Sequence, residues 1–125
     1  MVTTLRLEGI TLIKGTYRLE LYNDFIYIYD DSNNLIYTQS IDSWSKSTYN
    51  NNGNKTRYDN SKGLTEHYIY DDNNNLIKSI DNKGNWVKRK YNERGQVVQY
   101  RSNTHKTLII EYDKNGNILD LIERE

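Results

Sequence analysis

The chain has 125 residues with seventeen Lys and Arg, seventeen Asp and Glu and no Cys, which is the size of one ordinary domain with a net charge of zero. The lack of cysteine excludes disulfides and thiolate zinc sites, and the balanced charge argues against a general polyanion binder, although residues 46–110 carry twelve basic and six acidic groups. No apolar run is long enough for a signal peptide or a membrane span, so we expect a protein that works in the cytoplasm.

The first 28 residues are predicted to form a capping β-hairpin within that single domain. Alternate positions are apolar or aromatic at Tyr17, Leu19 and Leu21 and again at Phe25, Tyr27 and Tyr29. The intervening Asn23 and Asp24 are turn-forming residues. A hairpin of this kind suits the start of a repeat array, because the outermost unit of an array needs an atypical end.

Residues 29–125 carry a tandem repeat marked by tyrosine. The repeat tyrosines lie 20 or 21 residues apart and are Tyr29, Tyr49, Tyr70, Tyr91 and Tyr112. Each is followed directly by Asp or Asn, four residues later by Gly or Asn, and five residues later by Asn or Gln. Five copies that agree at four positions predict one structural unit repeated along the chain.

The repeated positions predict a tight turn between antiparallel strands. The Asp or Asn can accept a hydrogen bond from the backbone two residues further on, and the Gly or Asn tolerates the left-handed conformation that a type I turn with a G1 bulge requires. Weaker half-copies, such as Tyr58-Asp59 with Gly63 and Ile80-Asp81 with Gly84, place a further turn between the main ones. This spacing predicts an all-β fold, an antiparallel β-meander of tandem hairpin repeats, as an open twisted sheet or as a small rolled sheet or barrel.

Two of these segments resemble a known family. Residues 70–76 (YDDNNNL) and residues 112–118 (YDKNGNI) are similar to the YD repeats of Rhs-like bacterial proteins, whose long arrays form β-sheet shells around toxins. The resemblance covers about residues 27–121. It implies a bacterial protein built as a meander of twisted antiparallel strands, and it supplies no active site. The chain is far too short to enclose another protein.

The sequence supplies few groups for catalysis, for a cofactor or for a metal. His67 and His105 are the only histidines, and no nucleophile, paired-histidine or phosphate-loop motif surrounds them. Residues 71–75 resemble an oxygen-rich calcium loop, but the twelfth position from Asp71 is Asn82, where an EF-hand loop has a bidentate Glu. We therefore expect a protein that is not an enzyme and has no catalytic residue, no cofactor and no metal ligand.

A basic stretch with interleaved aromatic side chains, residues 86–106, offers a surface for nucleic acid. Its candidate residues are Trp86, Lys88, Arg89, Lys90, Arg94, Tyr100 and Arg101. Such a surface can hold a strand by its phosphates while bases stack on the rings. Because neighbours along a β-strand point to opposite faces, Lys88 and Lys90 are expected on one side and Arg89 on the other, which divides the charge.

Strand edges and tyrosine-rich surfaces favour protein binding. The edge strands of a meander can pair with a second copy, giving a homodimer, or with an exposed strand of a target. The chain has twelve Tyr and one Phe, whereas a dry core would favour Phe. The candidate anchors for a protein partner are Trp44, Tyr68, Trp86 and Tyr100.

Taken together, these features predict a non-catalytic protein-binding module of the bacterial cytoplasm. The expected action is that of a small inhibitor that docks on and blocks a larger protein or ribonucleoprotein, such as a phage anti-defence protein of the anti-CRISPR type or an immunity protein against a toxin. One alternative is an RNA- or DNA-binding protein that uses residues 86–106. Another is a structural or assembly subunit related to YD-repeat shells. No membrane partner is expected.

Overall fold

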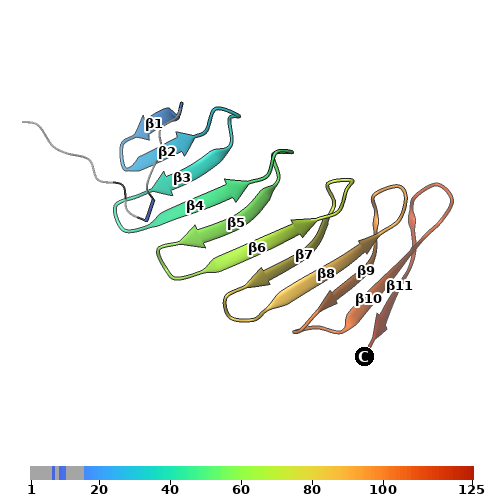
Figure 1. The fold of residues 1–125 in the computed structure, drawn as a ribbon. Helices are drawn as coiled ribbons and strands as arrows, with labels where there is room; N and C mark the ends of the chain where they lie inside the picture. Colours follow the sequence, from blue (N-terminus) through green and yellow to red (C-terminus); the bar gives the residue numbers. More distant parts are fainter. Residues whose placement is uncertain (1–6, 8, 11–15) are drawn as a thin grey trace, which may run out of the picture. The chain divides into compact units, whose positions relative to one another are not determined.

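The computed structural model describes residues 7, 9–10 and 16–125, which form eleven β-strands and no helix (Figure 1). The strands are β1 (Arg18–Tyr22), β2 (Phe25–Tyr29), β3 (Leu35–Gln39), β4 (Trp44–Tyr49), β5 (Lys55–Asn60), β6 (Thr65–Tyr70), β7 (Leu76–Asp81), β8 (Trp86–Tyr91), β9 (Val97–Ser102), β10 (Thr107–Tyr112) and β11 (Ile118–Arg124). Their order in the sheet follows the chain from β1 to β11 and does not return to β1, which is the order of an open meander. The predicted all-β meander of hairpins is confirmed.

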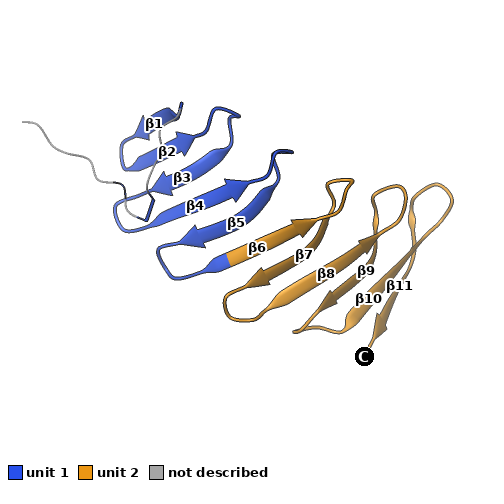
Figure 2. Cartoon of the chain, in the orientation of Figure 1, with its two compact units in different colours: residues 1–65 blue, residues 66–125 orange. Residues whose placement is uncertain are grey.

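Contacts divide the chain into two compact units, residues 1–65 and residues 66–125 (Figure 2). Unit 1 contains β1 to β5, unit 2 contains β7 to β11, and the division falls within β6 after its first residue. In unit 1, β1 and β2 form the predicted N-terminal hairpin, with Tyr22 paired to Phe25 across the turn. Most of the expected capping segment before residue 16 lies outside the described residues.

The turn after each repeat tyrosine is built by the side chain that follows it, as the turn after Tyr70 illustrates. Asp71 accepts hydrogen bonds at Oδ1 from the backbone N–H groups of Asn73 and Asn75, each at 2.9 Å. Asn74 has a positive φ of 66°, the left-handed conformation that Asn and Gly tolerate. The backbone N–H of Asn75 holds the pKa of the Asp71 carboxyl below its usual range, because it stabilises the ionised form. The predicted turn chemistry is therefore present.

Beyond the predicted G1 bulge of each turn lies a second β-bulge, which the sequence patterns did not predict. In unit 2, Tyr70 pairs with Leu76 but the preceding Ile69 pairs with Lys78, so Ile77 is an extra residue on its strand. The same one-residue shift follows each of the other repeat tyrosines, and the extra residues there are Ile36, Thr56, Val98 and Leu119. The bulge therefore belongs to the repeat and is one of its regular elements.

The bulge keeps the repeat tyrosines of a unit on the same side of the sheet. Side chains alternate between the two faces along a strand, so a repeat with an odd number of residues would turn every second copy over. The extra residue restores the alternation, and Tyr70 and Tyr91 then lie on one face, as the pairings of β6, β7 and β8 show. Each new repeat can therefore make the same contacts as the one before it.

The hydroxyl groups of the repeat tyrosines join successive repeats. In unit 1, Tyr49 donates a hydrogen bond of 2.7 Å to the backbone carbonyl of Leu35, the residue before the bulge. In unit 2, the Tyr91 hydroxyl donates to the carbonyl of Leu76 at 2.6 Å and the Tyr112 hydroxyl to that of Val97 at 2.7 Å. Burial raises the pKa of the Tyr49 phenol, as expected for a hydroxyl enclosed by neighbouring strands. These tyrosines hold the repeat together, and their hydroxyls are occupied.

One of the predicted half-copies is wrong by one residue. In the turn between β5 and β6, Asn60 takes the first turn position, since its carbonyl accepts the Gly63 N–H at 3.1 Å and its side chain accepts the Leu64 N–H at 3.2 Å. Asp59 was expected there. It remains in β5 and accepts a hydrogen bond from the Arg57 guanidinium at 2.8 Å, because the turn glycine must lie three residues after the capping side chain.

Few side chains are fully buried. Among the described residues, the buried hydrophobic side chains are Ile28 and Tyr37, which face each other on β2 and β3 of unit 1. Gly9 lies against the ring of Trp44 so closely that a Cβ atom there would be 2.4 Å from it. No helix in the described part of the chain is long and apolar enough to cross a membrane. Among the described residues, no polar or charged side chain is fully buried.

Candidate functional site

The sheet of unit 2 has two chemically different faces, defined by the pairing of its strands. The Trp face consists of the side chains that share a side with Trp86, and the Tyr face of those that share a side with Tyr91. Members of the Trp face are His67, Ile69, Lys78, Ile80, Trp86, Lys88, Lys90, Gln99 and Arg101, followed on β10 and β11 by Thr107, Ile109, Glu111, Asp120, Ile122 and Arg124. Members of the Tyr face include Glu66, Tyr68, Tyr70, Ser79, Asp81, Val87, Arg89, Tyr91, Tyr100 and Leu108.

Three cations lie directly opposite one another on the Trp face. Lys78 of β7 pairs with Lys88 of β8, which pairs with Arg101 of β9. Directly paired residues have Cβ atoms about 4.5–5.5 Å apart, and like charges at that spacing destabilise a sheet. We call these three residues the basic row. Its strand neighbour on β6 is the apolar Ile69.

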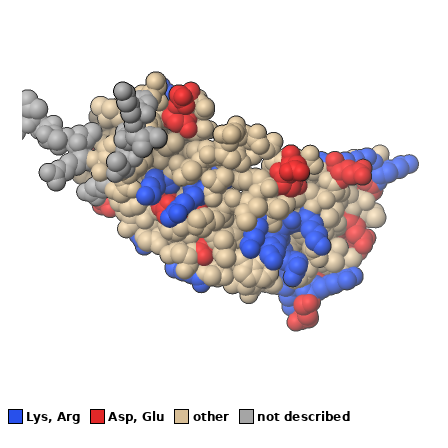
Figure 3. Space-filling view, viewed as in Figure 1, with Lys and Arg blue, Asp and Glu red and all other residues tan. Residues whose placement is uncertain are grey.

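The cations of the Trp face have no acidic partner within the sheet. Lys90 lies two residues along β8 from the basic row, opposite Gln99. No Asp or Glu of β7, β8 or β9 shares this face, and none of the four cations forms an ion pair among the residues that the structure describes. Figure 3 shows Lys and Arg side chains gathered over these strands. Over β7, β8 and β9 the face therefore carries an uncompensated positive charge, and its acidic residues, Glu111 and Asp120, lie on β10 and β11.

A half-buried aromatic ring adjoins the basic row. Trp86 begins β8, pairs with Ile80 of β7, and has the ammonium group of Lys88 5.2 Å from its ring centroid. Its backbone N–H donates a hydrogen bond of 2.8 Å to the side chain of Asn103, which fixes this end of the strand. The Trp face thus places an aromatic surface beside exposed positive charge.

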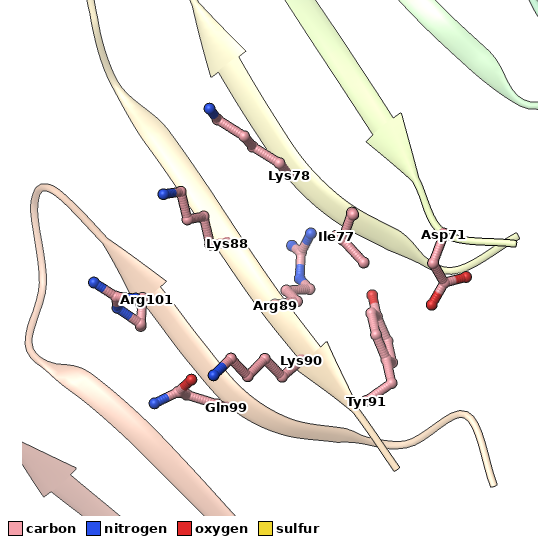
Figure 4. A pocket seen from close by; sticks show the side chains of 9 residues that line it. All are labelled: Asp71, Ile77, Lys78, Lys88, Arg89, Lys90, Tyr91, Gln99 and Arg101. Atoms are coloured by element: carbon pink, nitrogen blue, oxygen red, sulfur yellow. The ribbon is translucent and has the colours of Figure 1, made fainter. Parts of the chain in front are cut away.

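A shallow hollow of about 530 Å³ lies over this part of the sheet, and Figure 4 shows the side chains that line it. Lys78, Lys88, Lys90 and Arg101 extend from neighbouring strands at one end of the view. The single carboxylate of the lining is Asp71, which lies at the other end and whose oxygens accept hydrogen bonds within its own turn. The hollow is open and basic, so it suits an extended anionic ligand better than an enclosed small molecule.

The structure separates the residues that the sequence proposed for binding. Four of them, Trp86, Lys88, Lys90 and Arg101, come together on the Trp face of unit 2. Tyr68, Arg89 and Tyr100 lie on the Tyr face instead. Arg94 lies in the turn between β8 and β9, and Trp44 begins β4 in unit 1. The predicted alternation of Lys88 and Lys90 against Arg89 is present.

The cation of the Tyr face is engaged locally. The guanidinium of Arg89 lies 5.5 Å from the ring centroid of its strand partner Tyr100. The Tyr68 hydroxyl donates a hydrogen bond to a carboxylate oxygen of Glu66 on the same face. Arg94 donates a hydrogen bond of 2.7 Å to the backbone carbonyl of Lys114. These side chains already have partners within unit 2, whereas in the basic row the described contact is that of Lys88 with the ring of Trp86.

Two residues of the site were missed by reasoning from the sequence, Lys78 and Gln99. Both lie in strands neighbouring β8, and they join Lys88 and Lys90 only through the pairing register. Lys78 lies outside the basic stretch of residues 86–106, so local charge density gave no signal for it. Counting residues outward from the turn between β7 and β8 would have paired Lys78 with Lys88, because the two are equally far from that turn.

The described residues offer little for a metal or for acid–base chemistry. No group of three or more His, Asp or Glu side chains gathers among them. His67 is exposed on the Trp face, opposite Ile80, and the exposed His105 has its Nδ1 2.8 Å from the hydroxyl of Thr104. The oxygen-rich turns use their carboxylates to accept backbone hydrogen bonds, which leaves the basic Trp face as the strongest candidate site.

Comparison with known proteins gives no assignment for the chain. No protein-family model matches the sequence, and no curated protein matches it.

Proposed function

We propose that the chain is a cofactor-free binding module that docks on a larger macromolecule through the Trp face of unit 2. The observation that carries the proposal is the basic row, in which Lys78, Lys88 and Arg101 oppose one another without a carboxylate. Such a row lowers the stability of the isolated sheet, and an anionic partner would offset that cost by supplying the missing charge.

The form of the site supports binding over turnover. Its cations extend from strands of a sheet into an open hollow, whose other lining residues are Asp71, Ile77, Arg89, Tyr91 and Gln99. The Asp71 carboxylate accepts hydrogen bonds within its own turn, and the Tyr91 hydroxyl donates to the backbone carbonyl of Leu76. Acid–base catalysis needs a titratable group held at hydrogen-bond distance from a reacting atom, usually where water is excluded. An open basic surface favours association with a charged partner and speeds its approach.

A small module that covers part of a larger macromolecule can act as an inhibitor. We propose that this is its role, in the bacterial cytoplasm, with a protein or ribonucleoprotein as the blocked partner. Phage anti-defence proteins and toxin immunity proteins work by such coverage and are the closest functional classes. The cysteine-free composition suits a reducing compartment.

The repeat geometry also supports the proposed kinship with YD-repeat proteins. The Asp or Asn turn, the bulge after it and the tyrosine that bonds to the previous repeat recur with one register in each unit. A unit that contacts its neighbours in the same way each time can be added in series, which is the property of repeat arrays. In this proposal the short array serves as a scaffold for the binding face.

A binding assay with defined anionic probes tests the proposed function. The full chain is titrated against labelled poly-glutamate and against labelled single-stranded oligonucleotides, with fluorescence anisotropy as the readout. We expect saturable binding to at least one probe, and a loss of more than about tenfold in affinity for the double variant Lys88→Gln/Arg101→Gln, since two of the cations are removed.

The matched control is Lys62→Gln/Lys83→Gln, which removes two exposed turn lysines and the same charge. At both positions the contact to the turn is made by the backbone N–H, so the fold should be retained. If the wild-type chain binds none of the probes, or if both double variants weaken binding equally, the Trp face is not the docking site.

A further inference from the structure

We infer that the partner bound by the Trp face is a single-stranded nucleic acid, with its phosphates along the basic row and a base against Trp86. This inference rests on the proposed binding function and narrows its partner to one that presents an exposed single strand, such as a ribonucleoprotein. It is carried by three features of one surface: a line of repeated cations, an adjoining aromatic ring, and a carboxamide beside them.

The cations are arranged as a line that crosses the strands. Lys78, Lys88 and Arg101 come from three adjacent strands, and neighbouring strands lie about 4.8 Å apart, so the row spans roughly 10 Å. Lys90 adds a fourth positive charge on the same face, two residues along β8 from Lys88. A phosphodiester chain presents evenly repeated negative charges and can follow such a line.

The ring of Trp86 distinguishes a single strand from a duplex. The ring is half-buried on the same face, and the Lys88 ammonium lies 5.2 Å from its centroid, so a base on the ring would have its phosphate within reach of a cation. Bases of a duplex are stacked on one another and their faces are hidden, but those of a single strand are free to stack on aromatic side chains. A flat sheet face also lacks the protruding helix or ribbon that enters a groove of duplex DNA.

The polar neighbour of the cations can contact base edges. Gln99 lies opposite Lys90 and next to Ile109 of β10, on the Trp face. A carboxamide offers both donors and an acceptor, so it can pair with the edge of an unpaired base. Cations for the backbone, an aromatic face for stacking and a carboxamide for edges are the three contact types of sheet-based single-strand recognition.

Salt dependence measures the phosphate contacts directly. The full chain is titrated with a labelled oligouridylate at several salt concentrations between about 50 and 200 mM. Four cations predict a slope of log affinity against log salt near about −3, from roughly −0.7 for each phosphate contact to a single strand. Lys88→Gln should make the slope shallower by about 0.7, and Lys83→Gln should leave it unchanged.

Tryptophan variants test the stacking. Trp86→Ala should weaken oligouridylate binding by roughly five- to a hundred-and-fifty-fold, and Trp86→Phe, which keeps a ring, should retain most of the affinity. In a Trp44→Phe background, fluorescence reports Trp86 alone and should be quenched on binding. A far-UV circular dichroism spectrum and an unfolding midpoint of Trp86→Ala that match those of the wild type separate loss of stacking from a folding defect.

The probes separate failure of this inference from failure of the proposed function. Equal affinity for poly-glutamate and oligouridylate, or for a duplex and a single strand, or unchanged affinity in Trp86→Ala, would overturn the nucleic-acid inference and leave an anion-binding module. Absence of binding to every anionic probe would overturn both. Oligouridylate binding that is sensitive to salt, to Lys88 and to Trp86 together would support both.

Discussion

The same row of the sheet is neutral and partly buried in one unit and exposed and cationic in the other. In unit 1 the side chains opposite one another are Ile28, Tyr37, Lys46 and Asp59; in unit 2 they are Ile69, Lys78, Lys88 and Arg101. Tyr37 is 1% exposed and lies where unit 2 has Lys78. Lys46 pairs with the carboxylate residue Asp59, whereas Lys88, at the equivalent position, pairs with Arg101. The same backbone arrangement therefore supports buried side chains in unit 1 and a charged surface in unit 2.

The hydrogen bonds and turns that hold the backbone are the same in both units. The repeat tyrosine bonds to the residue before the bulge in unit 1, through Tyr49, and in unit 2, through Tyr91. Both units also have a turn glycine at which an added Cβ atom would meet nothing within 4 Å, Gly63 in unit 1 and Gly84 in unit 2. Because turns and tyrosines hold the backbone, the side chains between them can diverge without loss of the fold. The predictions below test where the units should respond alike and where they should not.

The largest difference is expected at the position of Tyr37. Tyr37→Ala should lower the free energy of unfolding by about 3–5 kcal/mol, because it removes a fully buried aromatic ring and leaves a cavity. The counterpart variant Lys78→Ala should change it by no more than about 0.5 kcal/mol, since the side chain lies at the surface of a cationic row. Urea denaturation followed by tryptophan fluorescence measures both. Equal losses would contradict the contrast between the rows.

The turn glycines should respond alike in the two units. Gly63 and Gly84 have φ values of 89° and 88°, and an added Cβ would meet nothing within 4 Å at either. Ala at either position should cost about 1–2 kcal/mol of unfolding free energy from backbone strain alone. Asn should cost less, because Asn74 occupies the same turn position with a φ of 66°. A large loss in one unit alone would mean that the turns are not equivalent.

The tyrosine hydroxyls should also be equivalent. Tyr49→Phe and Tyr91→Phe each remove one hydrogen bond to a backbone carbonyl and keep the ring in place. Each should lower the free energy of unfolding by about 0.5–1.5 kcal/mol. Hydrogen exchange of the strands on either side of the bulge should accelerate in the affected unit. No change in either variant would show that these hydroxyls are not needed to join the repeats.

The central lysines should respond with opposite signs. Lys46→Gln removes a cation that faces Asp59, so it should lower the free energy of unfolding by about 0.2–1 kcal/mol. Lys88→Gln removes the middle one of three like charges, so it should raise that free energy by a similar amount. Added salt should shrink both effects through screening. The comparison fails if the two variants shift stability in the same direction.

Acid should weaken unit 1 at a group that unit 2 lacks. A hydrogen bond from Arg57 holds the pKa of Asp59 below its usual range, with Thr65 and Lys46 contributing. A carboxyl with a lowered pKa in the folded state stabilises the protein above its unfolded pKa, near about 3.9, and loses that contribution as the pH falls through the folded value. Asp59→Asn should therefore be less stable than the wild type at neutral pH, and the difference should shrink below about pH 4. A constant difference would exclude this role for Asp59.

Much of the fold could be read from local chemistry. The Asp or Asn after each repeat tyrosine and the Gly or Asn three residues later act through hydrogen bonds within five residues, so their spacing located the turns and thereby the strands. Alternation along β8 correctly placed Lys88 and Lys90 on one face and Arg89 on the other. The bulge could not be read in this way, since its extra residue is an ordinary aliphatic or Thr side chain.

The sequence revealed only part of the candidate site, because the site is assembled by pairing between strands. The basic stretch of residues 86–106 contains side chains from both faces of the sheet and from a turn. The density of basic residues along the chain does not distinguish these locations. Lys78 was missed because it joins Lys88 across a strand boundary. Arg89 was included although its guanidinium lies over Tyr100 on the opposite face.

By itself the sequence determined the class of fold, the positions of the main turns and the face to which each side chain of a single strand points. These depend on hydrogen bonds and sterics between residues close along the chain. The tertiary structure decided the bulges, the bonds from repeat tyrosines to carbonyls fourteen or fifteen residues away, and the meeting of Lys78, Lys88 and Arg101 in one row. Those depend on the register between strands, which is set by what the whole sheet can pair and bury at once.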